Sequence, residues 1–174
     1  MAHLHFLRFS AFALLGSALW GGCCANDVCQ ADDPLADAIE LHLSRFSAAD
    51  LDTVILLRYP KDYTSSTRPE NVTLARSGLQ VSDSIIVLNN STPFSRVGNA
   101  NLGAYRYVVQ YLTHPNGINK GVPTEVLALE DLHVQGEYVK TSGCCTSYRN
   151  ITKTAVVRGK TVDLRANPIL RVTK

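Results

Sequence analysis

Adjacent cysteines are the residues of this chain whose type and spacing suggest chemistry. Cys144 and Cys145 stand side by side, and Cys29 is the third cysteine that remains beyond the first 25 residues. Three cysteines in an oxidising compartment cannot all pair within one chain. Either the neighbours form a strained vicinal disulfide, or Cys29 pairs with one of them, or one thiol pairs with another chain. Because the pair lacks a recognisable base and the Cys-x-x-Cys spacing of redox enzymes, we do not expect a catalytic thiol.

The first 25 residues have the three-part pattern of a secretory signal peptide. A weakly basic start that includes Arg8 is followed by the mostly apolar Phe12–Trp20 and by small residues that end at Ala25. A lipoprotein signal with a lipidated Cys23 and a signal anchor are the alternatives. No later stretch approaches the roughly 20 apolar residues that a spanning helix needs. We therefore expect residues 26–174 to be secreted and to have no membrane span.

Four Asn-x-Ser/Thr triplets, the acceptor sites of N-linked glycans, agree with an extracellular location. They begin at Asn71, Asn89, Asn90 and Asn150. Because the triplets at Asn89 and Asn90 overlap, we expect only one of those two residues to be modified.

The sequence gives no support for an enzyme or for a nucleic-acid partner. It contains no His-x-x-x-His, no Gly-x-Ser-x-Gly and no Gly-rich phosphate loop. Adjacent residues of a strand point to opposite faces, so we do not expect Glu130 and Asp131 to share a proton. A net charge of +2 without a basic stripe argues against nucleic-acid binding. We expect neither catalysis nor a cofactor.

The N-terminal part of the mature chain is predicted to be helical. Leu35, Ile39 and Leu43 recur at helical spacing, and an acidic cap and a proline precede them. This pattern predicts a helix over about Pro34–Phe46 and a helical segment over residues 33–63.

The remainder, residues 68–174, is predicted to be β. A strand is expected around Val72–Leu74 and another over Ala104–Leu112, because apolar and polar residues alternate between turn residues there. The stretch Gly117–Val139 is predicted to form a strand, a bend at the acidic pair Glu130-Asp131, and a second strand after a sharp turn at Gln135-Gly136. The chain is therefore predicted to be one mainly β domain.

The stretch Gly117–Val139 also has a specific spacing, whose marked positions are Gly117, Ile118, Val122, Pro123, Leu127, Asp131, Leu132, Val134, Gly136 and Tyr138. In this order they resemble a segment of the ligand-binding domain of Cys-loop (pentameric ligand-gated) receptors and acetylcholine-binding proteins. The chain departs from that pattern at Ala128, where the family has Trp, at Glu130, where it has Pro, and at Gln135, near its loop tyrosine. The resemblance extends over roughly residues 33–171 and stops before the family's disulfide-closed loop.

The resemblance implies an N-terminal helix followed by a partial immunoglobulin-like twisted β-sandwich over residues 26–174. It implies an extracellular ligand-binding-domain-like module of a neurotransmitter-gated (nicotinic acetylcholine receptor-like) channel subunit, or a secreted relative of acetylcholine-binding proteins. The expected partners are a small amine-type neurotransmitter and the other subunits of a homo- or hetero-pentamer. The location is extracellular, or the plasma membrane if the chain is part of a channel subunit.

The resemblance also implies a box of aromatic rings that binds a cationic amine. Ala128 and Gln135 remove ring faces from such a box, so the agonist site is expected to be degraded. Candidates for a substitute cluster are Tyr105, Tyr107, Tyr111 and Tyr138. The alternative is that these tyrosines pack on the sheet with their hydroxyls in water.

Two further alternatives remain open. Cys144-Cys145 and the nearby Tyr148 resemble the family's agonist-capping loop, but the segment after them resembles a part of the family that precedes the Cys-loop. On that alignment the cysteine pair lies in an insertion. The alternative function is a lineage-specific secreted β-sandwich glycoprotein that acts as an interaction or surface protein.

Overall fold

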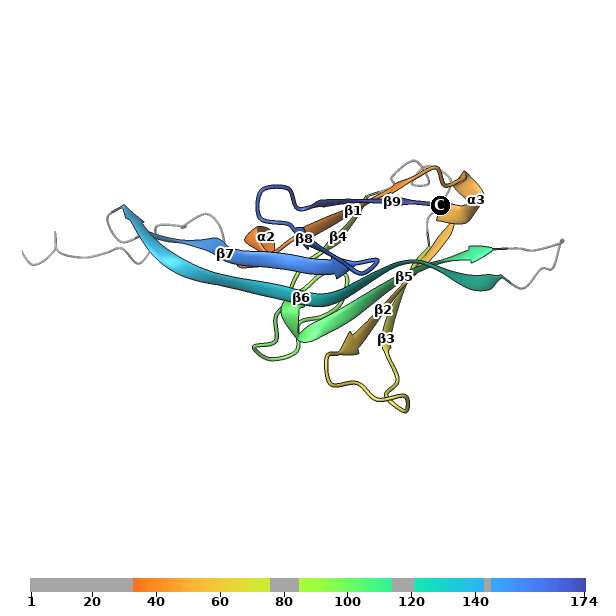
Figure 1. Cartoon of the computed structure of the whole chain (residues 1–174), viewed down its shortest axis with the longest axis horizontal. Helices are drawn as coiled ribbons and strands as arrows, with labels where there is room; N and C mark the ends of the chain where they lie inside the picture. Colours follow the sequence, from red (N-terminus) through yellow and green to blue (C-terminus); the bar gives the residue numbers. More distant parts are fainter. Residues whose placement is uncertain (1–32, 76–84, 114–120, 143–144) are drawn as a thin grey trace, which may run out of the picture. The chain divides into compact units, whose positions relative to one another are not determined.

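The computed structural model describes residues 33–75, 85–113, 121–142 and 145–174 (Figure 1). The chain divides into two compact units, one of residues 1–30 with Tyr138–Ser147 and one of Ala31–Glu137 with Tyr148–Lys174. The core described below belongs to the second unit, as do the sheets apart from residues 138–142 and 145–147. No helix among the described residues is long and apolar enough to cross a membrane.

The described elements are mostly strands. Two helices of one turn each, α2 (Asp33–Ala36) and α3 (Ala48–Leu51), and a 3-10 turn, η1 (Leu102–Ala104), are the helical elements of this part of the chain. The strands are β1 (Ile39–Ser44), β2 (Thr53–Pro60), β3 (Glu70–Ala75), β4 (Ile85–Leu88), β5 (Tyr105–Thr113), β6 (Val122–Ser142), β7 (Cys145–Val157), β8 (Lys160–Asp163) and β9 (Ile169–Thr173).

These strands form two sheets. One has six strands in the order β3-β2-β5-β6-β7-β8, and the other has three in the order β4-β1-β9. β1 runs antiparallel to β4 and parallel to β9, so the first and last described strands lie side by side. The prediction of a mainly β chain is confirmed, and two sheets are consistent with a β-sandwich.

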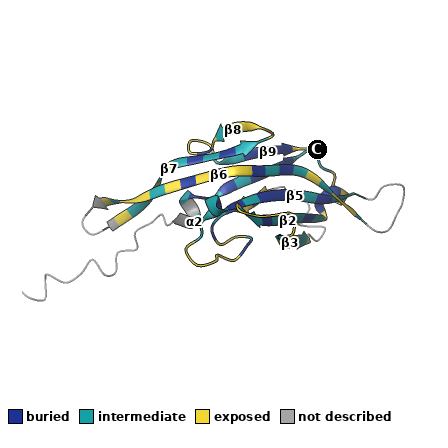
Figure 2. Ribbon diagram, turned by 60° about the horizontal axis from the view of Figure 1, so that its bottom comes forward, coloured by how far each residue is buried: buried dark blue, intermediate teal, exposed yellow. Residues whose placement is uncertain are grey.

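The hydrophobic core draws on both sheets. Apolar residues alternate with more exposed ones along the strands, as the alternating colours in Figure 2 show. Burial of apolar surface contributes about 25 cal/mol per Å² to the free energy of folding. The inward-facing apolar side chains of the strands are therefore the main source of stability. The fully buried members include Ile39, Leu41, Val54, Leu56, Leu88, Leu129, Leu132 and Val172.

The predicted helix over Pro34–Phe46, and with it the helical segment 33–63, is wrong. α2 ends at Ala36, and β1 follows with Ile39 and Leu41 fully buried. Residues four apart share one face both in a helix and in a strand, so Ile39 and Leu43 fit either structure. Leu41 decides the matter, because it continues the alternation only in a strand.

β6 passes through the predicted acidic bend without a break. Leu127 and Leu129 are buried before it and Leu132 after it, while Glu130 and Asp131 are both exposed. Asp131 has a positive φ of 43°, so one extra residue enters the alternation as it does at a β-bulge. The expectation that the two carboxylates point to opposite faces is therefore wrong.

The sharp turn predicted at Gln135-Gly136 is also wrong, because both residues lie inside β6. Gly136 has a different role there. The ring of Tyr148, on the neighbouring strand β7, lies so close that a Cβ on Gly136 would overlap its Cζ atom. Tyr148 thereby brings its hydroxyl within 3.5 Å of the Asp37 carboxylate.

Gly136→Ala should therefore lower the melting temperature by several degrees, because the added methyl displaces Tyr148 or separates the strands at about 1–3 kcal/mol. Thermal unfolding followed by circular dichroism measures the effect. Gln135→Ala, at the exposed neighbouring position, is the control and should leave the melt unchanged. Equal melting temperatures for the two variants would show that Tyr148 does not depend on the glycine.

α3 is held by a charged contact. Ser47 and Asp50 form a capping box, in which the Ser47 amide and hydroxyl donate to Asp50 Oδ2 at 2.8 and 2.7 Å. Lys174 Nζ lies 2.8 Å from both carboxylate oxygens of Asp50. Burial raises the pKa of Asp50, but the hydrogen bonds from Lys174 and Ser47 outweigh it, so the pKa lies below its ordinary value of 3.8. The hydrogen bond to Asp50 raises the pKa of Lys174 in turn.

A lowered carboxyl pKa gives a definite pH dependence. The stabilisation by Asp50 should be complete above about pH 5 and should disappear as the pH falls through the folded-state pKa. The melting-temperature difference between the wild type and Asp50→Asn should therefore be constant from about pH 5 to 7 and shrink in stronger acid. Asp52→Asn, at an exposed site of the same turn, is the control. A difference that persists undiminished at the most acid pH would contradict the contact.

Candidate binding site around a buried arginine

Of the four tyrosines predicted to contact a ligand, the three that lie in the second unit do not form one cluster. Tyr105, Tyr107 and Tyr111 lie on the inward face of β5 and are at most 8% exposed, whereas Tyr138 is 63% exposed and belongs to the other compact unit. The rings of Tyr105 and Tyr107 are neighbours, with centroids 6.3 Å apart. Tyr111 instead meets Phe46 edge to face at 5.4 Å. The structure thus brings together two of the four residues.

A guanidinium group lies among these rings. The central carbon of Arg58 is 4.3 Å from the centroid of the Tyr105 ring and 4.8 Å from that of Phe94. Arg58 is 3% exposed, because Val54, Leu56 and Arg58 occupy alternate inward positions of β2. Each ring face attracts a desolvated cation by about 0.5–2 kcal/mol. The arrangement holds a cation between aromatic faces, but the cation belongs to the chain itself.

Polar contacts complete the environment of Arg58. Its Nη2 donates to Glu70 Oε2 at 2.5 Å and to the Ser95 carbonyl at 3.2 Å, while Nε has no hydrogen-bond partner within the described structure. Burial raises the pKa of the neighbouring Tyr107 hydroxyl, and the Arg58 charge offsets only part of that effect. The Tyr107 phenol is therefore neutral, and Glu70 is the ion-pair partner of Arg58.

A second cation lies over the Tyr111 ring. Lys174 Nζ is 5.2 Å from its centroid, in addition to its contact with Asp50. The buried tyrosine faces that the sequence offered to an amine ligand are thus partly occupied by internal cations. Arg58 is not among the residues predicted from the sequence, because it falls in the segment predicted to be helical. The sequence feature that could have identified it is its spacing: Arg58 follows Val54 and Leu56 at every second residue, and alternate residues of a strand share one face.

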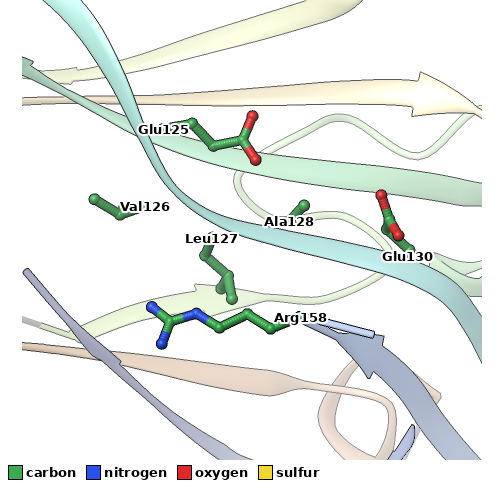
Figure 3. A pocket seen from close by; sticks show the side chains of 6 residues that line it. All are labelled: Glu125, Val126, Leu127, Ala128, Glu130 and Arg158. Atoms are coloured by element: carbon green, nitrogen blue, oxygen red, sulfur yellow. The ribbon is translucent and has the colours of Figure 1, made fainter. Parts of the chain in front are cut away.

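An open hollow of about 260 Å³ lies along β6 (Figure 3). Figure 3 shows Glu125, Ala128 and Glu130 on one side of β6 and Leu127 and Arg158 on the other. Glu130 forms an ion pair with Arg106 at 3.1 Å. Neither Glu125 nor Arg158 has an ion-pair partner among the described residues, so this hollow presents charges of both signs that a partner can neutralise. Its full lining is Glu125, Val126, Leu127, Ala128, Glu130 and Arg158.

A separate polar cluster joins the start of β1 to β7. Lys153, 2% exposed, donates from Nζ to the carbonyls of Ala36 and Ala38. Burial lowers the pKa of Lys153, and the nearby charge of Asp37 raises it again in part. Asp37 accepts a hydrogen bond from Asn90 Nδ2 at 3.0 Å. The contacts of this cluster hold backbone segments together.

The other predicted sites differ in accessibility. Asn71 is exposed and Asn89 half-buried, whereas Asn90 is 4% exposed and Asn150 donates from Nδ2 to the Ala36 carbonyl.

The disulfide candidates Cys29, Cys144 and Cys145 fall outside the described residues or side chains. The described residues contain no group of three or more His, Cys, Asp or Glu side chains placed to hold a metal ion.

Comparison of the chain with protein-family models, with curated proteins and with solved structures finds no match.

If Arg58 fills a cation site, its removal should leave a space that accepts a small guanidinium compound. Arg58→Ala should lower the melting temperature by the equivalent of about 2–4 kcal/mol, and millimolar methylguanidinium should restore part of that loss. Leu56→Ala, at a fully buried apolar position of the same strand, is the matched control and should gain nothing. An equal response of the two variants would show that the rings do not select a cation.

Proposed function

We propose that this chain is a secreted β-sandwich glycoprotein that acts by binding other molecules as an interaction or surface protein, and not by catalysis. The observation that carries the proposal is the use of its buried ionisable groups. Arg58, Asp50 and Lys153 each contact a partner that joins segments of the fold. Catalytic sites concentrate such perturbed groups in a cleft. Here the open hollow is lined by exposed charges.

The proposed binding surface is the hollow on β6. Glu125 and Arg158 are exposed, carry opposite charges and have no ion-pair partner among the described residues. Exposed charges of both signs favour a partner with the complementary arrangement, and they act mainly on association rate and specificity. The half-buried side chains of Val126 and Ala128 add apolar surface between them.

The second candidate is the ligand-binding-domain-like module of a neurotransmitter-gated channel, or a relative of acetylcholine-binding proteins, with an immunoglobulin-like sandwich and a pentameric assembly. One observation favours it. The ring faces of Tyr105 and Phe94 hold a cation, the Arg58 guanidinium of β2, and Tyr105 is one of the tyrosines expected to contribute to an amine site. In this candidate Arg58 takes the place of the ammonium group, so the module binds amines poorly.

Expression in eukaryotic cells with the chain's own N-terminus tests the first candidate. The expected product appears in the medium, begins near residue 26 and loses mass on treatment with a glycosidase. Retention of the chain inside the cell, or its release without a glycan, would overturn the secreted-glycoprotein proposal. Light scattering of the secreted product then separates the two candidates, because a five-fold mass supports the second.

Acetylcholine is the probe for amine binding. Titration followed by tyrosine fluorescence should show no saturation in the low micromolar range, because internal cations occupy the ring faces. Glu125→Gln and Arg158→Gln are matched variants at the open hollow and should behave like the wild type in this titration. Saturable binding at low micromolar acetylcholine or tighter would contradict both candidates as stated.

A further inference from the structure

Four strands terminate the two described sheets. They are β3 and β8 in the six-stranded sheet, and β4 and β9 in the three-stranded sheet. The outer edge of a terminal strand offers backbone donors and acceptors to any other extended chain. Natural proteins protect such edges with charged side chains, proline, short strands or a cover.

The four terminal strands are protected unequally. β8 contains Lys160 and Asp163, and β9 contains Arg171. β4, by contrast, has the uncharged sequence Ile-Ile-Val-Leu. The charged residue of β3 is Glu70, which forms an ion pair with Arg58. The rest of that strand, Asn-Val-Thr-Leu-Ala, has neither a charge nor a proline. Uncharged segments rich in β-branched residues are those that pair with other chains.

Each of the two strands with little charge protection carries or adjoins an accessible glycan acceptor. Asn71 is exposed on β3, and the Thr73 hydroxyl of its triplet is exposed two residues further along the same face. Asn89 directly follows β4. Its Oδ1 accepts from the Ser91 amide at 2.8 Å and from the Ser91 hydroxyl at 3.2 Å, and its Nδ2 has no hydrogen-bond partner among the described residues.

The side-chain amides of the other two acceptor asparagines, the buried Asn90 and the half-buried Asn150, are engaged in contacts within the fold. Asn90 donates to Asp37 and accepts from the Leu102 amide at 2.7 Å. Asn150 donates its side-chain amide to the Ala36 carbonyl. A glycan on either nitrogen would crowd a contact that fixes the start of β1, so we do not expect one there in the native fold.

We propose that N-linked glycans on Asn71 and Asn89 cover the terminal strands β3 and β4 and prevent edge-to-edge association of the protein. The proposal rests on the secreted-glycoprotein function, because that route supplies the donor, a lipid-pyrophosphate-linked oligosaccharide. The Asn Nδ2 forms a bond to the anomeric carbon of the sugar and loses one proton. The bond from that carbon to the pyrophosphate oxygen breaks, and the lipid pyrophosphate leaves.

Glycopeptide mapping of the secreted wild type is the first measurement. Sugar is expected on Asn71 and Asn89 and not on Asn90 or Asn150. Modification of Asn90 or Asn150 in folded protein would overturn the assignment. A chain that carries no glycan at all would overturn the proposed function together with this inference.

Removal of the acceptors tests the protective role. Thr73→Ala and Ser91→Ala abolish the triplets of Asn71 and Asn89 but retain both asparagines, and the Asn90 triplet keeps Thr92. The double variant should shift in light scattering from the mass of the wild type to at least twice that mass. Trimming the folded wild type to one sugar per site with an endoglycosidase should give the same shift, without any change in folding.

A charged replacement provides the matched control. Thr73→Lys with Val87→Lys and Ser91→Ala removes the same glycans and places a charge on each of the two strands. This variant should retain the wild-type mass distribution although it carries neither glycan. If the alanine variant and the trimmed protein keep the wild-type mass at equal concentration, the glycans do not protect the edges. In that result the secreted-glycoprotein function would still stand.

Discussion

The buried guanidinium of Arg58 is the contact on which the arrangement of the large sheet depends. It lies on β2, pairs with Glu70 of β3, contacts the Tyr105 ring of β5 and donates to the carbonyl of Ser95. A cation in a core costs several kcal/mol unless rings and hydrogen-bond acceptors surround it, so these partners must take fixed positions once Arg58 faces inward. One side chain thus fixes β3, β5 and a connecting segment around β2.

The same constraint governs the other buried charges. Lys153 of β7 donates to carbonyls at the start of β1, near Asp37, and Asp50 pairs with Lys174 beside α3. Each buried charge joins segments that are distant in the sequence, because a group removed from water needs partners wherever the fold can supply them. The proposed function accordingly assigns binding to the surface, where Glu125 and Arg158 border the open hollow on β6.

Surface chemistry and sheet topology are related in this chain. Charged residues occupy the terminal strands β8 and β9, whereas the predicted glycan acceptors accompany β3 and β4. A bulky hydrophilic glycan and a charged side chain oppose strand pairing by different means, one by excluded volume and one by the cost of desolvation. The topology therefore gives a physical reason for the positions of Asn71 and Asn89 that a list of triplets does not contain.

The alternation of residues by itself determined that the chain is mainly β, and it placed β3 and β5 close to their observed positions. It did not decide between helix and strand at Ile39 and Leu43, because residues four apart share a face in both structures. Tertiary structure alone decided that Arg58 takes the ring faces of Tyr105 and Phe94 and that Asn90 lies inside. Those outcomes depend on which strands become neighbours in a sheet. Strand pairing brings together residues that are far apart in the sequence, so no local sequence pattern predicts their contacts.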